Sequence, residues 1–412
     1  MRGARALNKL DEQVATLMQG TDYGDPHLRE AMELELRERL EEAEKSKRSL
    51  RVYCGFDPRT ADLHIGHTVP MRKLRQFQEY GHEVTFLIGT YTSLIGDPSD
   101  KDQLRPQLSS KAVEDNARTY AEQAMRILDP ERTLIRYNAD WLQKLNFADL
   151  INLSSHFTIQ QFLTRDNFRK RWEKGDAIYL HETFYSIMQA YDAYTLDADV
   201  QVGGTDQLFN IVTAGRKLMT ALGAKPNVGI IVGILPGTDG EIKMSKSLGN
   251  HIPLNSTPED MFGKVMSVPD EAMPDYMRLV TRWTAAKVEE MIHITQSGEL
   301  HPRDAKMQIA REITGAYYGN ESAREAQEAF VQVFQKGGVP EDMPEHMLTG
   351  DESVLDVLVA NQLVSSNSEG KRIVKQKGVR LDGQTLHDAL AAFPGPGVLQ
   401  VGKRKFLRVL DA

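Results

Sequence analysis

The chain has 412 residues, which predicts about two to four domains at roughly 100–200 residues each. Apolar residues make up 41% and charged residues 26%, a composition that excludes collagen-like and wholly disordered chains. The 50 basic and 58 acidic residues give a net charge of −8, so contact with nucleic acid requires a local basic patch. A single cysteine, Cys54, excludes a disulfide framework and a cysteine-rich zinc site.

The N-terminal segment lacks the apolar core of a secretory signal, and no run of about 20 apolar residues follows anywhere. We therefore expect a cytoplasmic protein with no membrane span. Residues 1–50 are highly charged and helical in pattern, as in Met32–Lys45, and the interpretation that we favour is a solvated helical extension.

A strand–helix–strand pattern follows this extension. Arg51–Phe56 is a predicted strand, Met71, Leu74 and Phe77 have helical spacing, and Glu83–Gly89 is a nearly continuous apolar strand. Such a βαβ unit implies a parallel sheet with a right-handed crossover.

Two more buried strands, Asp199–Gly203 and Val228–Leu235, are predicted on either side of a helix that starts at Thr205. Between the two pairs of strands lies a largely helical insertion with one strand at Thr133–Tyr137. The predicted fold class is therefore α/β, with a Rossmann-type parallel sheet. We expect a domain built on this sheet with its helical insertion at 51–257, an α-helical domain at 258–335, a Gly/Pro-rich linker at 336–350 and a small α+β unit at 351–412.

Two histidines stand where the first strand leads into a helix. His64 and His67 flank Gly66, and backbone N–H groups at such a helix start favour phosphate. Imidazoles there can donate hydrogen bonds to phosphate oxygens as charge develops. The alternative is a loop histidine followed by a helix N-cap, and a zinc site would need further ligands that the sequence does not offer nearby.

A lysine-rich loop follows the last predicted strand. It reads Lys243, Met244, Ser245, Lys246 and Ser247, and such a loop can close over a triphosphate. Taken alone it could equally be an exposed loop with two ordinary lysines. Together the motifs His64–His67 and Lys243–Ser247 resemble the HIGH and KMSKS signatures of class I aminoacyl-tRNA synthetases.

The helix predicted at His181–Leu196 carries Tyr185, Gln189 and Asp192 on one face. A phenol, an amide and a carboxylate suit a pocket for a polar small molecule, although a buried polar network that only supports the fold is the alternative. The pattern is similar to the tyrosine-pocket helix of bacterial tyrosyl-tRNA synthetases. So are Tyr53–Pro58 and Gly203–Gln207, and the resemblance extends from residue 50 to the C-terminus.

This resemblance implies a role for each matching residue. Asp192 and Tyr53 would bind the phenol of tyrosine, and Asp97 would meet its ammonium with Tyr185 and Gln189. Gln207 would contact the carboxylate region. The ATP site would consist of Gly55, Asp57, His64, Gly66, His67, Asp206, Lys243, Met244, Ser245, Lys246 and Ser247, and His64, His67, Lys243 and Lys246 would stabilise the leaving pyrophosphate.

One departure from the family lies after Gln207, where Leu208-Phe209-Asn210 replaces the Trp-Gly-Asn of some members.

Three rival interpretations are a tryptophanyl enzyme, a non-catalytic RNA-binding paralogue and a small-molecule adenylyltransferase. The polar helix face disfavours the first, the two intact motifs disfavour the second, and the C-terminal unit disfavours the third.

The C-terminal unit is locally basic. Residues 351–412 hold nine Lys and Arg against seven Asp and Glu, and the basic residues cluster at Lys371, Arg372, Lys375, Lys377 and Arg380. A solvated helix face is the alternative to RNA contact on charge alone. The unit resembles an S4 RNA-binding domain, which implies that these five side chains bind RNA.

The resemblance also implies the ligands and partners: L-tyrosine and ATP as substrates, Mg²⁺ with the ATP, tRNA(Tyr), and a second copy of the chain in a homodimer. No residues are expected to form a dedicated metal site. The apolar residues Phe147, Leu150, Phe157 and Phe162 of the insertion are candidates either for the core or for a symmetric dimer surface.

Overall fold

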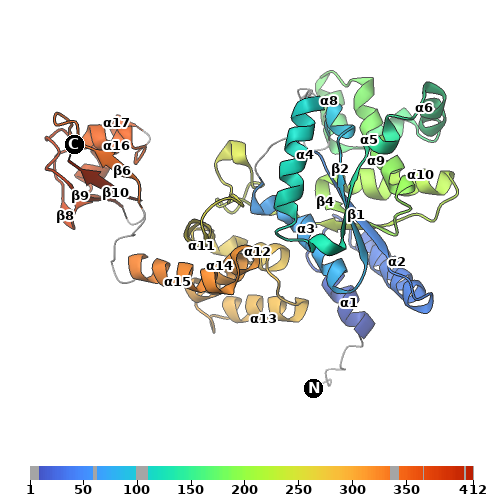
Figure 1. Cartoon of the computed structure of the whole chain (residues 1–412), viewed down its shortest axis with the longest axis horizontal. Helices are drawn as coiled ribbons and strands as arrows, with labels where there is room; N and C mark the ends of the chain where they lie inside the picture. The colour runs from blue at the N-terminus through green and yellow to red at the C-terminus, as the bar shows by residue number, and fades with distance from the viewer. Residues whose placement is uncertain are drawn as a thin grey trace. The chain divides into compact units, whose positions relative to one another are not determined.

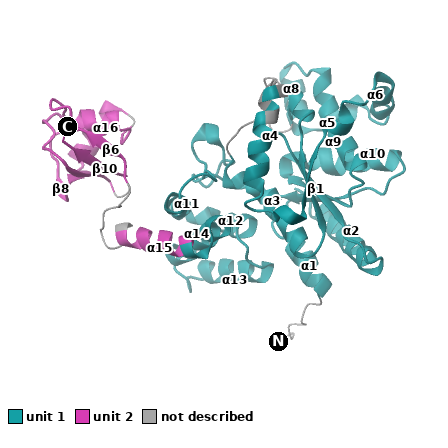
Figure 2. Ribbon diagram, in the orientation of Figure 1, with its two compact units in different colours: residues 1–321 teal, residues 322–412 magenta. Residues whose placement is uncertain are grey.

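The computed structural model describes residues 9–58, 63–98, 110–334, 343–364, 366–402 and 405–411. The chain divides into two compact units, Met1–Glu321 and Ser322–Ala412 (Figures 1 and 2). Each unit has its own sheet. Among the described helices, none is long and apolar enough to cross a bilayer.

The sheet of the first unit is parallel and has the order β3-β2-β1-β4-β5. This confirms the predicted parallel sheet. The predicted bounds of β1 and β3 are matched, whereas β2 and β5 end earlier and β4 starts later than predicted, and the five strands are β1 (Arg51–Phe56), β2 (Glu83–Ile88), β3 (Thr133–Tyr137), β4 (Val200–Gly204) and β5 (Val228–Val232).

Helices surround this sheet, and most of those between β2 and β4 form the predicted insertion. α3 (Ile65–Glu79) packs on β1, β2 and β4. The insertion consists of α4 (Ser110–Ala124), α5 (Ala139–Leu142), α6 (Phe147–Ser154), α7 (Ile159–Leu163), α8 (Asp166–Lys174) and α9 (Leu180–Thr195), with short 3₁₀ turns η1 (Thr92–Leu94) and η2 (Pro130–Arg132).

The N-terminal helices are part of the first unit, so the prediction of a solvated extension is wrong. α1 (Lys9–Met18) packs against α3, and α2 (Pro26–Lys45) packs against β5. The apolar side chains of α2 form a narrow buried stripe at positions 32, 36, 40 and 43. The other faces of α2 carry its charges, which is why composition alone suggested a solvated helix.

A buried ion-pair cluster fastens α2 to the sheet. Asp199, just before β4, is 2% exposed and accepts from Arg39 Nη1 at 3.0 Å and from Arg48 Nη1 at 2.8 Å. It also accepts from the Arg51 backbone N–H at 2.9 Å. Burial alone would raise the pKa of the Asp199 carboxylate. The hydrogen bonds from Arg48 and Arg51, together with the charges of these two arginines, lower it below its ordinary value. A buried charge held this way is costly to leave unpaired.

The helix predicted to start at Thr205 has three parts. It begins as a 3₁₀ turn, η3 (Thr205–Gln207), continues as a π-helix, η4 (Phe209–Gly215), and becomes regular at α10 (Arg216–Ala221). A π-helix bonds i to i+5, and such turns are rare and frequent at functional sites. This one begins two residues after Gln207.

The region after β5 is helical, as predicted. Its last 3₁₀ turns and helices are η5 (Lys246–Leu248), α11 (Pro258–Met266), η6 (Asp270–Ala272), α12 (Met273–Val280), α13 (Ala285–Gln296), α14 (Pro302–Tyr318) and α15 (Asn320–Phe334). The end of α14 contacts α3, where the Tyr317 hydroxyl lies 2.6 Å from Thr68 Oγ1, one residue after His67. α15 spans the boundary between the two units.

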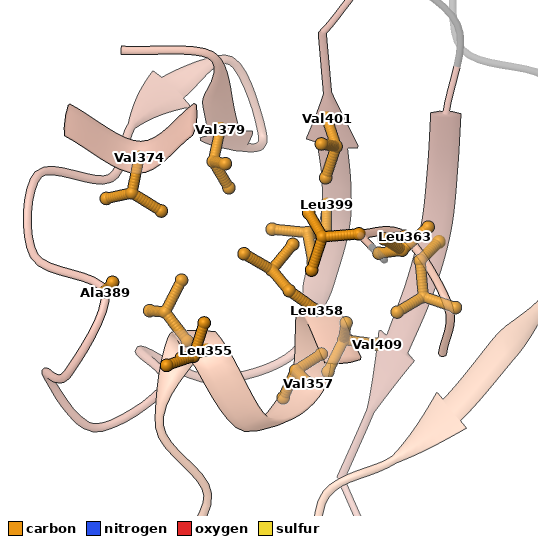
Figure 3. Close-up of a cluster of buried hydrophobic side chains, with 13 residues drawn as sticks. Leu355, Val357, Leu358, Leu363, Val374, Val379, Ala389, Leu399, Val401 and Val409 are labelled. Atoms are coloured by element: carbon orange, nitrogen blue, oxygen red, sulfur yellow. The ribbon is translucent and has the colours of Figure 1, made fainter. Parts of the chain in front are cut away.

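The second unit contains a five-stranded mixed sheet of order β6-β10-β9-β7-β8 beside two short helices. The strands β9 and β10 form an antiparallel hairpin. Leu358, Leu399 and Leu407 are fully buried in the hydrophobic core of the second unit, and Figure 3 shows Leu358 and Leu399 among the inward-pointing side chains. The elements are β6 (Glu345–Met347), α16 (Val354–Ala360), α17 (Asn367–Lys375), β7 (Val379–Leu381), β8 (Gln384–Thr385), β9 (Gly397–Val401) and β10 (Lys405–Leu410).

The strand β6 corrects the predicted linker. The segment 336–350 was expected to be irregular, but β6 pairs in parallel with β10 and is part of the sheet. Its three residues are too few for a periodicity to be read from the sequence. Residues 336–342 of this segment lie outside the described residues.

Candidate active site

A cavity of about 340 Å³ opens at the carboxyl edge of the parallel sheet. Ligands of open α/β sheets bind at this edge. The cavity is lined by the six residues predicted for the tyrosine pocket, Tyr53, Asp97, Tyr185, Gln189, Asp192 and Gln207. It is also lined by four residues of the predicted ATP site, Gly55, Asp57, His67 and Asp206.

Asp192 is held by two donors that sequence analysis did not identify. It lies on α9 and is 2% exposed, and its carboxylate accepts from Trp141 Nε1 at 2.7 Å and from Asn138 Nδ2 at 3.1 Å. Burial raises the pKa of Asp192 to about 7, although both hydrogen bonds oppose the shift. Asn138 directly follows β3 at the carboxyl edge of the sheet, and this position could have indicated from the sequence that it lies at the site.

Tyr53 presents a polar atom to the cavity with no partner among the described residues. Its side chain, in the middle of β1, is 1% exposed, and its hydroxyl is buried without a hydrogen bond. Burial, and then the nearby charge of Asp192, raise the pKa of this phenol. An unpaired buried hydroxyl is unfavourable unless a ligand supplies the missing partner.

Asp57 is fixed from two sides where β1 ends. Its carboxylate accepts from the Tyr185 hydroxyl at 3.0 Å and from Thr92 Oγ1 at 2.8 Å. A Cβ at Gly89 would stand 2.2 Å from Asp57 Oδ1, so the backbone after β2 can approach this carboxylate only because residue 89 is glycine. The Tyr185 hydroxyl thus bonds to Asp57 in this structure, a contact that was not predicted from the sequence.

Asp97 and Gln207 both line the cavity and are hydrogen-bonded to each other. Gln207 Nε2 donates to Asp97 Oδ2 at 2.5 Å, and Asn210 Nδ2 donates to Gln207 Oε1 at 2.9 Å. Nearby, the Oε1 atom of Gln189 is buried with no partner among the described residues. The cavity therefore combines one carboxylate–amide pair with unpaired polar atoms of Gln189 and Tyr53.

His64 and His67 lie together at the start of α3, with ring centroids 3.8 Å apart. His67 Nδ1 accepts from the His64 backbone N–H at 3.2 Å, which leaves the proton of a neutral ring on Nε2. Burial lowers the pKa of His67 to about 4 and that of His64 to about 2, so both rings are neutral at pH 7. Neutral imidazoles can still donate one hydrogen bond each.

The lysine loop lies near these histidines because the chain that follows it pairs with the start of α3. The backbone N–H of Ile65 donates to Ile252 O at 3.0 Å, and that of Leu254 donates to Leu63 O at 3.0 Å. A Cβ at Gly66 would stand 3.0 Å from His64 Nδ1 and 3.5 Å from Met244 Cβ. A side chain at 66 would thus crowd the His64 ring, while its contact with Met244 would be an ordinary one.

Within the loop, Lys243 reaches the cavity. Its Nζ lies 3.8 Å from Oδ2 of Asp206, which lines the cavity, although Lys243, Lys246 and Ser247 are all exposed. The loop is held at its base by Asn250, whose Oδ1 accepts from the Ser245 backbone N–H at 2.8 Å. Sequence analysis did not identify Asn250, although it stands next to the predicted motif.

The predicted RNA-binding residues belong to the second unit. Val374 of α17 is buried in the core of that unit. The five basic side chains are exposed on α17 and on the chain up to β7, and they are Lys371, Arg372, Lys375, Lys377 and Arg380.

Residues 45–335 match the family model of class I tRNA synthetases for tryptophan and tyrosine. The chain belongs to this family. It is 45% identical to the tyrosine–tRNA ligase of Thermotoga maritima, over 92% of this chain and 95% of that protein. Against the tyrosine–tRNA ligase of Haemophilus influenzae the identity is 43%, over 98% of each chain. Within the family, it therefore groups with the bacterial-type tyrosyl-tRNA synthetases.

Solved structures agree at the level of fold. A tyrosyl-tRNA synthetase from Archaeoglobus fulgidus, complexed with L-tyrosine, superposes with a TM-score of 0.59 at 23% identity, covering 77% of this chain and all of that one. A mitochondrial tyrosyl-tRNA synthetase from Aspergillus nidulans gives 0.62 at 22% identity, covering 79% and 94%. The α/β class predicted from the sequence is thus confirmed.

Proposed function

We propose that this chain is a tyrosine–tRNA ligase that activates L-tyrosine with ATP and then transfers it to the 3′ end of tRNA(Tyr). The observation that carries the proposal is the buried pair of Asp192 and the unpartnered Tyr53 hydroxyl in the cavity. The membership of the family and the identity of the curated relatives agree with it.

The proposed tyrosine site uses both ends of the cavity. The phenol of the substrate bonds to Tyr53 and Asp192, and phenylalanine is rejected because it leaves the buried Tyr53 hydroxyl unpaired and offers no hydrogen bond to Asp192. The ammonium lies near Asp97, within reach of Tyr185 and Gln189. Gln207, which already bonds to Asp97, faces the carboxylate.

In the first step an oxygen of the tyrosine carboxylate attacks the α-phosphorus of ATP. A P–O bond forms, the bond to the β-phosphate oxygen breaks, and pyrophosphate leaves with the electron pair. The carboxylate is ionised at pH 7, so the step needs no general base. Catalysis comes from positioning and from charge stabilisation on the leaving group.

The stabilising groups come from the two motifs. His64 and His67 donate neutral N–H groups, and Lys243 and Lys246 bring positive charge from the loop. The remaining ATP contacts proposed from the family pattern are Gly55, Asp57, Gly66, Asp206, Met244, Ser245 and Ser247. The pairing of Lys243 with Asp206 supports the placement of the loop beside the nucleotide.

Mg²⁺ is proposed to enter bound to the phosphates of ATP. Mg²⁺ usually keeps several waters and binds through substrate phosphates and one or two carboxylates. Within the described ranges, no three His, Cys, Asp or Glu side chains are grouped as metal ligands would be. Asp57 and Asp206 are separate carboxylates that fit this limited role, and when bound the ion neutralises phosphate charge.

In the second step the terminal ribose hydroxyl of tRNA(Tyr) attacks the carbonyl of tyrosyl-adenylate, and AMP leaves. The second unit is proposed to be an S4-like domain over 351–412 that binds the tRNA through its exposed basic residues. Structured RNA is recognised largely by shape and backbone contacts, so exposed cations suffice. The α-helical domain, 258–335, is proposed to lie on the anticodon side, and the reaction to take place in the cytoplasm.

A homodimer is also proposed, because large apolar side chains of the insertion are exposed. Phe147 is 77% exposed, Trp172 67% and Leu180 65%, and the edge strand β3 exposes Leu134 and Ile135. Phe162, by contrast, is buried, and Leu150 and Phe157 are partly buried. Exposed apolar groups of this size mark interaction surfaces.

The test of the proposed activity is ATP–pyrophosphate exchange with tyrosine, phenylalanine and tryptophan in parallel. Exchange that depends on tyrosine alone is expected. Exchange with tryptophan would overturn the roles of Asp192 and Tyr53. Absence of exchange with all three, from folded protein with Mg²⁺, would favour an RNA-binding paralogue.

A further inference from the structure

A line of hydrogen bonds runs from the cavity into the protein behind it. It begins with Asp97 and Gln207, which face the cavity, and continues through Asn210 and Ser186. Ser186 Oγ donates to Asn210 Oδ1 at 2.8 Å, and Arg165 Nη1 donates to Ser186 Oγ at 2.8 Å. The line thus connects a guanidinium that does not line the cavity with two groups that do.

The residues behind the cavity are buried. Ser186 and Asn210 have no exposed surface, and Arg165 is 5% exposed. The guanidinium of Arg165 lies over the rings of Phe168 and Phe209, at 5.1 and 5.2 Å from their centroids. Burial lowers the pKa of Arg165, and the charge of Asp97 acts in the opposite direction. An arginine remains protonated under these conditions, so a fixed positive charge stands at the end of the line.

The direction of every hydrogen bond in the line follows from this arginine. A guanidinium only donates, so the lone pair of Ser186 Oγ faces it and the hydroxyl proton points to Asn210 Oδ1. The amide nitrogen of Asn210 then faces Gln207, which turns the Gln207 oxygen inward and its Nε2 toward Asp97. With the amide of Gln207 reversed, two NH₂ groups would oppose one another.

We propose that Arg165 is a positioning residue for tyrosine activation, which acts through Ser186 and Asn210 to hold the Gln207 amide with its N–H groups toward the substrate carboxylate. This inference rests on the proposed function, in which Gln207 faces that carboxylate. Arg165 itself touches no substrate in this arrangement. Its effect is to exclude the reversed amide, which would present an oxygen to a carboxylate.

The test interrupts the line at its middle. Ser186→Ala removes one hydroxyl, and Asn210→Asp keeps the shape but cannot donate to Gln207. Each is expected to lower kcat/KM for tyrosine in exchange by ~10- to 100-fold, as a small misplacement of a reacting group does, with KM for ATP unchanged. Thr314→Val, a buried change in α14, is the matched control for loss of a buried hydroxyl.

Two further measurements separate positioning from general support of the fold. Tyrosinol lacks the carboxylate, so its affinity should stay within about 2-fold in Ser186→Ala while tyrosine binding weakens. Arg165→Lys, which still only donates, should retain more activity than Arg165→Met. Equal weakening of tyrosinol and tyrosine binding would overturn the proposal.

Gln207→Ala tests the proposed role of Gln207 separately from the positioning role of Arg165. If this variant activates tyrosine normally, the proposed role of Gln207 fails and the inference falls with it. If Gln207→Ala loses activity but Ser186→Ala and Asn210→Asp do not, only the positioning role is wrong.

Discussion

Asp192 in the cavity and Lys371 on α17 are both charged side chains proposed to bind a substrate, but they differ in burial and in how firmly they are held. Asp192 is 2% exposed and is held by two donors, whereas Lys371 of α17 is exposed. Fixed, desolvated groups discriminate between ligands that differ by one atom. Exposed cations bind a large polyanion with little demand on their own geometry.

This comparison predicts a large effect wherever a buried charge loses its partner. Asp199→Ala leaves Arg39 buried without its carboxylate, and it should lower the free energy of unfolding of the first unit by about 3–5 kcal/mol. Glu42→Ala breaks an exposed pair with Lys225 and should cost less than about 1 kcal/mol. Urea denaturation of both variants tests the contrast, and similar losses would contradict it.

The lysine loop sharpens the comparison, because Lys243 is half exposed yet is assigned to the reaction. Lys243→Ala should lower kcat for exchange by ~10²- to 10³-fold, since it removes charge stabilisation of the leaving group. Thermal stability should be unchanged. Lys45→Ala, on the exposed side of α2, is the control, and a loss of only a few-fold in Lys243→Ala would remove this residue from the mechanism.

At the phenol end, Tyr53→Phe separates stability from selectivity. Loss of a buried, unpartnered hydroxyl should raise the stability of the unliganded protein, while discrimination between tyrosine and phenylalanine should fall by ~10- to 100-fold. Melting temperature and the ratio of kcat/KM values for the two amino acids are the measurements. A melting temperature that falls together with activity would mean that the hydroxyl supports the fold.

The exposed cations of the second unit should affect only the RNA step. Lys371→Ala, Arg372→Ala and Lys375→Ala together are expected to lower tRNA charging by ~10-fold and to reduce its dependence on salt concentration. Exchange with tyrosine should be unchanged. Lys45→Ala with Lys225→Ala is the control, which removes two exposed charges from the first unit, and an equal effect of that pair would argue against a local RNA-binding face.

The last prediction concerns pH and His67. Its pKa is about 4 in the folded protein and 6.5 in its ordinary state, so the unfolded chain binds the proton more tightly between these values. The free energy of unfolding should therefore rise with pH from about 4 to 6.5, by at most about 1.4 kcal/mol per pH unit from this group. His67→Asn should show a shallower rise, and an identical slope would mean that His67 is accessible to solvent.

The sequence was sufficient to predict those parts of the molecule that a short motif or a regular spacing of residue types indicates. The parallel sheet followed from apolar runs, and the pocket residues of α9 from their spacing at i, i+4 and i+7. Trp141 could not be foreseen, because its contact with Asp192 joins residues 51 positions apart. For α2 the buried stripe was present but narrow, and the charges around it favoured the wrong interpretation.

The predicted roles of individual residues depend on geometry that a sequence does not contain. Tyr185 of α9 meets Asp57 just after β1, and the line of bonds from Arg165 to Gln207 joins the residue before α8 to α9, η4 and η3. Neither Arg165 nor Ser186 belongs to a recognisable motif. They were found only once their contacts were known.

The π-helix η4 has a consequence for how this chain tolerates insertions and deletions. A π-helical turn, with its i to i+5 bonds, holds more residues than the 3.6 of an α-helical turn, so removing one residue from Phe209–Gly215 would let this segment close as a regular α-helix. Because Asn210 lies within the segment and bonds to Gln207 just before it, such a deletion would move the side chain that links Gln207 to Ser186. The segment is thus a place where the number of residues, and not only their identity, is under constraint.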